Sequence, residues 1–305
     1  MNNNAEIPLI KEYHLDRLKK CIECIDQNAF RRENQKDCIL KLYPDERGKS
    51  VAHREKSIFR GMVIPSLRYL GLIIGYGDFI RASANGKLLI ENQNVDDELN
   101  RRISRAVIYE TDQSIFHFID LIKNLFPKGG IPTSLSVGEV IRRVSESIEA
   151  ASNLQKRERI KKWLSILKQV ELVTSSSSSI LLNDQETMSL NEQKLVQTLK
   201  DSDITLKDPE AFKGYFLDSY SQLGRDSAGV VAIADLREKV SLKMLREQRA
   251  ILTEGQFDKM LRQLPVETES YMISFGKPMG AGEKLFRSNK GEYFKTIFIK
   301  SYKRG

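Results

Sequence analysis

One acidic pattern in the chain has the composition of a metal-dependent nuclease site. Nucleases of this kind use an Asp and an (Asp/Glu)-x-Lys on adjacent strands, where the carboxylates hold a divalent metal that activates water. The only Glu-x-Lys is Glu192-Gln193-Lys194, and Asp184 lies upstream of it. The flanking residues, SLN and LVQTLK, have the spacing of a helix rather than a strand. We therefore expect no catalytic residue and no metal, and we keep a divergent metal-dependent endonuclease as a hypothesis.

Cysteine and histidine offer a second potential metal site near the N-terminus. Cys21-x-x-Cys24, Cys38 and His14 could supply four zinc ligands. The alternative is core packing, because Cys21 and Cys24 fall at helical spacing with apolar neighbours in the sequence. The sequence favours core packing. The odd number of cysteines also predicts that there is no disulfide framework.

Other catalytic patterns do not occur in the sequence. There is no GxxxxGK[ST] phosphate loop. The three histidines, His14, His53 and His117, are far apart and form neither H-x-x-x-H nor H-x-E. The sequence therefore predicts a protein that is not an enzyme and that carries no cofactor.

Arginine, lysine and glutamine recur on one face of three amphipathic helices, predicted over residues 56–70, 157–170 and 253–264. Such side chains can bond to guanine and adenine edges and to phosphates when a helix lies in the major groove. On a single helix they more often serve solubility, but three such helices favour nucleic-acid binding. The candidate DNA-binding residues, including basic residues after the third helix, are Lys56, Arg60, Arg68, Arg157, Lys161, Lys168, Gln256, Lys259, Arg262, Lys277, Lys284, Arg287, Lys290 and Lys295.

A pair of short strands is predicted after each of these helices. The first pair, residues 72–74 and 79–81, surrounds the turn Gly75-Tyr76-Gly77-Asp78. The second pair surrounds the serine run 175–179, and the third surrounds a long basic loop over residues 276–291. A helix followed by a short antiparallel hairpin is typical of a winged helix-turn-helix. The sequence therefore predicts three such units in tandem.

Local signals indicate where some of the helices begin and end. Gly71 is predicted to end the first helix in a left-handed conformation, and Ser83 to begin the next helix. Pro65 is expected to kink the first helix or to mark a later start. Thr253 and Gln256 have the spacing of a capping box, which predicts the start of the third helix.

The composition of the chain indicates its cellular compartment and the kind of partner that it binds. The net charge of +8 and the pI near 9.2 are common in proteins that meet an anionic partner. Residues 284–305 hold seven basic residues against Glu292, a net charge of +6. The N-terminus is polar and charged, and no apolar run approaches the roughly 18 residues of a membrane span. We expect a cytoplasmic protein that has no contact with a membrane.

Length and repeats together predict an α+β, predominantly helical chain of 305 residues with more than one domain. Its winged helix-turn-helix units have short antiparallel wings. The predicted segments are 1–127, an N-terminal helical region with the first unit; 128–183, the second unit; 184–208, a connecting helix or linker; and 209–305, the C-terminal unit with a long basic wing.

The order of these elements resembles the DNA-recognition region of type IIS restriction endonucleases of the FokI kind, which is built from successive winged-helix-like subdomains. The resemblance lies in SIFRGMVIPSLRYLGLIIGYGDFIRASANGKLLIEN and in RERIKKWLSILKQVELVTSSSSSILL, within residues 55–182. It implies recognition of double-stranded DNA in a restriction or phage-defence system. Those enzymes also carry a nuclease domain with a PD-(D/E)xK site, and this sequence contains no such motif.

The sequence leaves three hypotheses for the function. The first is a non-catalytic double-stranded DNA-binding protein, a recognition or loading subunit whose protein partner supplies the enzymatic activity. The second is a protein-interaction scaffold of a chromosome-maintenance or defence complex, which would expose apolar residues such as Ile64 on an outward helix face. The third is the divergent endonuclease built on Asp184, Glu192 and Lys194.

Overall fold

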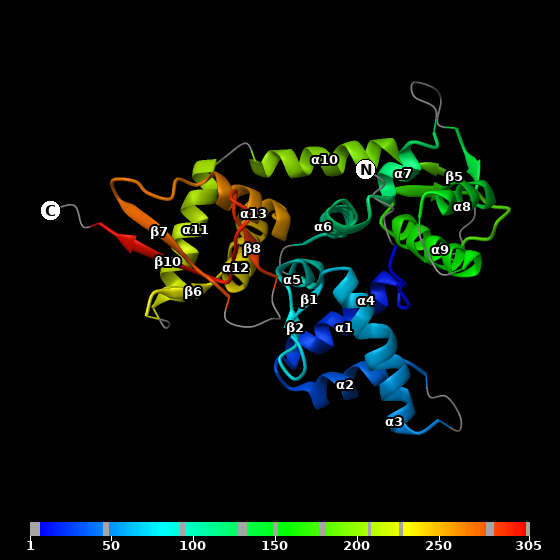
Figure 1. Ribbon diagram of the computed structural model, residues 1–305, viewed down its shortest axis with the longest axis horizontal. Coiled ribbons are helices and arrows are strands. Elements are labelled where there is room, and N and C mark those ends of the chain that lie inside the picture. The colour runs from blue at the N-terminus through cyan, green and yellow to red at the C-terminus, as the bar shows by residue number, and fades with distance from the viewer. Residues whose placement is uncertain are drawn as a thin grey trace.

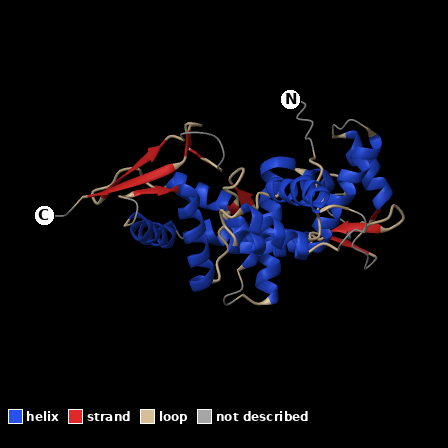
Figure 2. Cartoon of the chain, turned by 90° about the horizontal axis from the view of Figure 1, so that it is seen from below, coloured by secondary structure: helices blue, strands red, loops and turns tan. Residues whose placement is uncertain are grey.

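The computed structural model is an α+β protein in which helices predominate and the sheets are small and antiparallel, as predicted. The two regions that carry three-stranded sheets lie at opposite ends of the molecule (Figure 1, Figure 2). The N-terminal helices lie between and below them in the view of Figure 1. The structure describes residues 7–44, 49–91, 95–126, 133–148, 152–176, 181–206, 209–225, 228–278 and 284–302.

The N-terminal region is a cluster of helices with one short hairpin. Its elements are α1 (Leu15–Gln27), α2 (Arg32–Lys41), α3 (Val51–Arg54), the π-helix η1 (Glu55–Val63), α4 (Ile64–Tyr69), β1 (Ile73–Ile74), β2 (Arg81–Ala82), α5 (Ala84–Ile90) and α6 (Asp97–Thr111). The two strands pair antiparallel, and Gly71 has the predicted left-handed conformation with φ of 69°. The hydroxyl of Ser83 accepts the N–H of Gly86 at 3.0 Å, which confirms the predicted helix start.

Pro65 lies inside a continuous helical segment instead of ending it. The turns before it form η1, in which the N–H of Ile64 donates to the carbonyl of Phe59, five residues back. Pro65 then falls in the first turn of α4. This position tolerates a proline because first-turn N–H groups need no partner within their own helix. The segment buries one apolar face, with Phe59, Val63 and Leu67 almost fully enclosed.

The second region contains a three-stranded sheet with strand order β3-β5-β4. Its elements are η2 (Asp112–Phe116), α7 (Phe118–Lys123), β3 (Leu135–Ser136), α8 (Val137–Glu146), α9 (Asn153–Gln169), β4 (Val173–Ser175) and β5 (Thr187–Leu190). Residues 177–179 of the serine run lie outside the described residues.

The position predicted for the third strand of this sheet was wrong. β4 pairs with β5, which follows Asn183, and not with the residues directly after the serine run. The side-chain oxygen of Asn183 accepts the N–H groups of Gln185 and Glu186 at 3.0 Å each and forms an Asx turn there. Beyond the turn, Met188 and Leu190 point inward in strand alternation. These residues lie within 184–208, the segment for which the sequence predicts a connecting helix or linker.

The C-terminal region repeats the same strand order, with β10 between β6 and β7. Its elements are α11 (Pro209–Gly224), β6 (Val230–Ala232), α12 (Ile233–Gln248), α13 (Glu254–Gln263), β7 (Tyr271–Gly276), β8 (Phe286–Arg287), β9 (Tyr293–Phe294) and β10 (Thr296–Ser301). Both halves of the predicted Thr253–Gln256 capping box are present. The connecting helix α10 (Glu192–Leu206) runs from the second region to this one (Figure 1).

Two apolar cores hold these regions together. The larger one extends from the N-terminal helices through the second region, where Phe116 meets Trp163 edge to face at 5.1 Å. The smaller one lies within the C-terminal region. Leu245 and Ile251 of the C-terminal region are nevertheless buried in the larger core. The first two regions therefore share one core, and the third is anchored to it.

The cysteines depart from the sequence expectation. Cys24 and Cys38 form a disulfide that joins α1 to α2, so the prediction of no disulfide was wrong. Helix packing brings Cys38 to Cys24, and spacing along the chain does not reveal this contact. Cys21 stays a buried thiol, and burial raises its pKa to about 12. In the part of the chain that the structure describes, no group of three His, Cys, Asp or Glu side chains could hold a metal.

No helix within the described residues is both long enough and apolar enough to cross a bilayer.

A buried carboxylate, Asp112, joins η2 to α7. Its two oxygens accept the N–H groups of Phe118 at 2.8 Å and Ile119 at 2.9 Å, across the left-handed residue His117. Asp112 is fully buried, and this burial raises its pKa from 3.8 to about 6, although both hydrogen bonds oppose the shift. The folded protein therefore holds this proton more tightly than the unfolded chain does.

We predict that Asp112 lowers the free energy of unfolding as pH rises from about 4 to about 6, by about 3 kcal/mol. Below this window the group is protonated in both states, and above it the folded state contains a buried charge. Urea unfolding of the wild type and of Asp112→Asn at several pH values measures the effect. Parallel pH profiles for the two proteins would contradict the prediction.

Candidate nucleic-acid interface

Exposed cations gather where α13 meets the β8–β9 hairpin. Lys259 is exposed on α13, and Arg287 and Lys290 are exposed on the hairpin. Arg262 links the two elements, because its Nη1 donates to the carbonyl of Arg287 at 3.0 Å. Asn289 returns the contact, with its Nδ2 donating to the carbonyl of Arg262 at 3.3 Å. These five residues are called the α13–hairpin surface below.

The hairpin that holds these cations is fixed from beneath by aromatic side chains. Phe286 and Phe294 are buried, and each ring centre lies 5.3 Å from that of Phe275 on β7. Gly291 closes the turn with a left-handed φ of 82°, and its N–H donates to Ser288 at 3.0 Å. The exposed cations are therefore carried on a backbone with a defined shape.

The other end of α13 lies against the N-terminal region. The amide of Asn85 on α5 accepts the N–H of Glu254 at 3.0 Å and donates to Glu110 at 2.9 Å. Lys284 reaches into the same place, where its Nζ lies 2.5 Å from Glu254 and 2.7 Å from the carbonyl of Gly71. These five residues form a polar contact that we call the α5–α13 junction.

Charge balance at this junction rests on Lys284. Burial alone would raise the pKa of Glu254, but Lys284 and Arg237 hold it below its usual value. The hydrogen bonds and the charge of Lys284 offset the burial of Glu110 only in part, so burial raises the pKa of Glu110. Arg237 adds support by holding Asp258 with two hydrogen bonds of 2.8 Å and by donating to the carbonyl of Lys284 at 2.7 Å.

Two of the candidate residues on and after α13 are thus engaged within the protein. Gln256 accepts the N–H of Thr253 at 2.8 Å in the capping box, and Lys284 is part of the junction. Lys277 is exposed and lies 3.7 Å from Glu292.

Two of the three candidate cations of the first helix also have partners within the protein. Arg60 donates to Glu55 at 2.8 Å. Arg68 donates to the carbonyl of Gly75 at 2.8 Å, and its guanidinium lies 4.4 Å from the ring centre of Tyr76, so it braces the β1–β2 hairpin. Lys56 is exposed on η1.

On α9, the candidate residues face a carboxylate from the loop before β5. Arg157 and Lys161 both pair with Asp184, the latter at 2.9 Å, while Lys168 is half-buried. The N-terminal segment covers another part of this helix. Gln169 donates to the carbonyl of Tyr13 at 2.8 Å and accepts the N–H of Leu15 at 2.9 Å.

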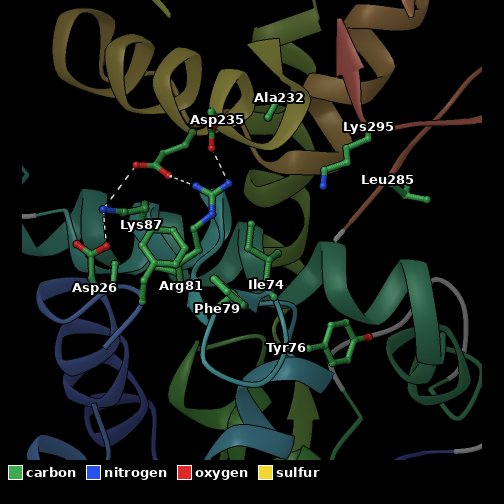
Figure 3. Close-up of a pocket in the computed structure, with 15 residues that line it drawn as sticks. Asp26, Ile74, Tyr76, Phe79, Arg81, Lys87, Ala232, Asp235, Leu285 and Lys295 are labelled. Carbon is green, nitrogen blue, oxygen red and sulfur yellow. Dashed lines mark ion pairs between the residues drawn. The ribbon is translucent and has the colours of Figure 1, made fainter. Parts of the chain in front are cut away.

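Lys295 lines a cavity of about 710 Å³ between the β1–β2 hairpin and the start of α12 (Figure 3). Ion pairs cross this cavity. Arg81 lies 2.5 Å from Asp235 and 3.6 Å from Glu238, and Lys87 lies 3.5 Å from Glu238. Because these acids and bases neutralise each other, the cavity has little net charge.

The structure does not assemble the three candidate nuclease residues. Asp184 is held by two cations of α9. Glu192 and Lys194 lie in the first turn of α10, and Lys194 is 3.4 Å from Glu171. The helical spacing read from the sequence around Glu192 is confirmed.

The sequence did not predict the residues that hold the α13–hairpin surface together. Asn289 lies in a loop whose basic charge gave no sign of its role, although Ser288-Asn289-Lys290-Gly291 has the composition of a tight turn. Arg237 looked like one more solvent-facing arginine of α12. Its burial depends on tertiary packing against α13, which no local pattern encodes.

The chain matches no protein-family model, no curated protein and no solved structure.

We predict that Lys284→Met lowers the free energy of unfolding by about 2 kcal/mol, because it leaves Glu254 buried without its cation. The value is reduced from that of a fully buried pair because Lys284 is 38% exposed. Chemical denaturation measures it.

A double-mutant cycle with Glu254→Gln tests the pairing itself. The double variant should recover much of the loss, because the amide needs no counter-charge. Lys290→Met, an exposed lysine on the same hairpin, serves as the matched control and should change stability by less than about 0.5 kcal/mol. Strictly additive single effects would argue against the pairing.

Proposed function

We propose that this protein binds double-stranded DNA through tandem winged-helix units and does not itself catalyse a reaction. The observation that carries the proposal is the element order of the second and third regions. In each, a helix and a short strand precede two helices, and a strand pair then completes a sheet whose last strand lies in the middle. This order is typical of a winged helix-turn-helix, in which the third helix and the hairpin contact DNA, and it supports the proposal.

The α13–hairpin surface is the part of the molecule best suited to that contact. Its cations project from two elements that in a winged helix face the duplex, and Lys259, Arg287 and Lys290 are exposed. Lysine and arginine on a hairpin favour contacts with the phosphate backbone over the reading of base edges. We therefore assign most of the binding free energy to phosphate contacts, which do not depend on sequence.

The wider role rests on the resemblance to the recognition region of FokI-type enzymes. We propose a recognition or loading subunit of a restriction or phage-defence system, with a protein partner that supplies the enzymatic activity. The experiment described below measures the binding of DNA and does not depend on this wider role.

A scaffold for other proteins is the second candidate, and one observation favours it. Phe30, Tyr76 and Phe79 line the neutral cavity between the first and third regions, and they are 56%, 59% and 71% exposed. Exposed aromatic side chains of this kind are frequent at protein interfaces. The scaffold hypothesis also predicted that Ile64 would be exposed on an outward helix face, but Ile64 is buried.

Fluorescence anisotropy with random-sequence duplex DNA at several salt concentrations tests the proposal. We predict salt-dependent binding by the wild type. Replacing Lys259, Arg287 and Lys290 with alanine should weaken binding on all sequences alike. It should also lower the slope of log affinity against log salt by about three, since each phosphate contact contributes about 0.9.

The matched control removes the same charge elsewhere. Lys20, Lys41 and Lys123 are exposed on α1, α2 and α7, and their triple alanine variant should keep most of the wild-type affinity and slope. Equal losses in the two triple variants would assign binding to net charge and not to this surface. No binding of duplex DNA at low salt would refute the DNA-binding proposal and favour the scaffold.

A further inference from the structure

A small apolar cavity lies directly beside the exposed cations of the α13–hairpin surface. It has a volume of about 300 Å³, at the lower end of the range for small-molecule sites. Leu261 and Leu264 of α13 form one side of it, and Phe275, Phe286 and Phe294 form another. Phe275 is only half-buried, so its ring is accessible from outside, while Phe286 and Phe294 lie beneath it.

Polar groups surround the mouth of this cavity. Arg262, Asn289 and Lys290 line it, and Glu292 contributes a carboxylate that is half exposed. Ser288 also lines it, and its Oγ atom is buried without a hydrogen-bond partner in the protein. A buried hydroxyl is usually hydrogen-bonded. This one is available to a ligand that enters the cavity.

The combination of aromatic walls, an amide at the mouth and flanking cations suits one kind of ligand. A nucleobase stacks on aromatic rings and bonds through its Watson–Crick edge to amide and hydroxyl groups. Cations beside it can hold the phosphates on either side. A phosphate or a simple apolar side chain would use only part of this set.

We propose that the cavity between α13 and the β8–β9 hairpin receives a single base that has left the stack of the bound DNA. This inference rests on the proposed DNA binding and adds a base-binding site to it. Asn289 and Ser288 are the residues that bond to the base, while Phe275 provides the stacking surface. Arg262 and Lys290 hold the adjacent backbone. Because a base must first be unstacked, duplexes in which a base is already extrahelical are the preferred ligands.

The experiment compares a fully paired duplex with the same duplex carrying one bulged 2-aminopurine. The full-length protein should bind the bulged duplex at least about tenfold more tightly, because the unstacking cost has already been met. The fluorescence of the bulged 2-aminopurine should change on binding. Anisotropy reports the affinity for both duplexes, so binding of DNA is measured separately from capture of the base.

Two substitutions locate the site. Val266 lines the cavity and is 55% exposed, and Val266→Trp should fill it, removing the preference for the bulge while leaving paired-duplex affinity unchanged. Val230→Trp is the matched control, since Val230 is 50% exposed on β6 and does not line the cavity. Asn289→Ala, which leaves the apolar walls intact, should lower the preference. It provides a second variant if Val266→Trp does not fold.

The outcomes separate this inference from the function on which it rests. Equal affinity of the wild type for the two duplexes would overturn base capture and leave DNA binding intact. A bulge preference that survives both Val266→Trp and Asn289→Ala would also overturn the assignment to this cavity. Failure to bind either duplex would remove the proposed function, and the inference with it.

Discussion

The contact between the N-termini of α5 and α13 determines how the rest of the molecule is arranged. Asn85 and Glu254 exchange hydrogen bonds across it, and Lys284 supplies the positive charge that a buried carboxylate requires. Helix N-termini carry partial positive charge, so carboxylates placed between two of them are stabilising. Glu110 and Glu254 are such carboxylates. The C-terminal region is thereby held against the N-terminal core.

This contact also decides which part of α13 faces solvent. In helix-turn-helix proteins, residues near the start of the recognition helix reach the base edges. Here the start of α13 is buried in the junction, and its C-terminal half remains exposed beside the hairpin. Under the proposed DNA binding, the exposed side chains of α13 are suited to contacts with the phosphate backbone. The reading of bases would then come from another feature of this surface.

The sequence could predict whatever depends on neighbours along the chain. The capping box at Thr253, the left-handed Gly71 and the apolar faces of the helices are local, and the structure confirms them. The disulfide of Cys24 depends on helix packing across the fold, which local patterns do not predict. The predicted position of β5 was wrong because this strand follows the Asx turn at Asn183 and not the serine run directly. The basic residues of the sequence indicated that α13 and the following loop carry positive charge, but not which of these residues are exposed. Lys284 looks like any other lysine of a basic loop until its buried partner is known.

The connecting helix α10 runs between the two regions that carry three-stranded sheets (Figure 1). It is fixed to the larger core, in which Leu195 is buried, and to the N-terminal region, where Asp201 lies 2.8 Å from Arg102 of α6. Each residue of an α-helix adds about 1.5 Å and turns the chain by about 100°. The length of α10 therefore contributes to the separation of the two ends, together with the α5–α13 junction. A relative of this protein with one residue more or fewer in α10 would need a compensating change at the α5–α13 junction to keep the same geometry.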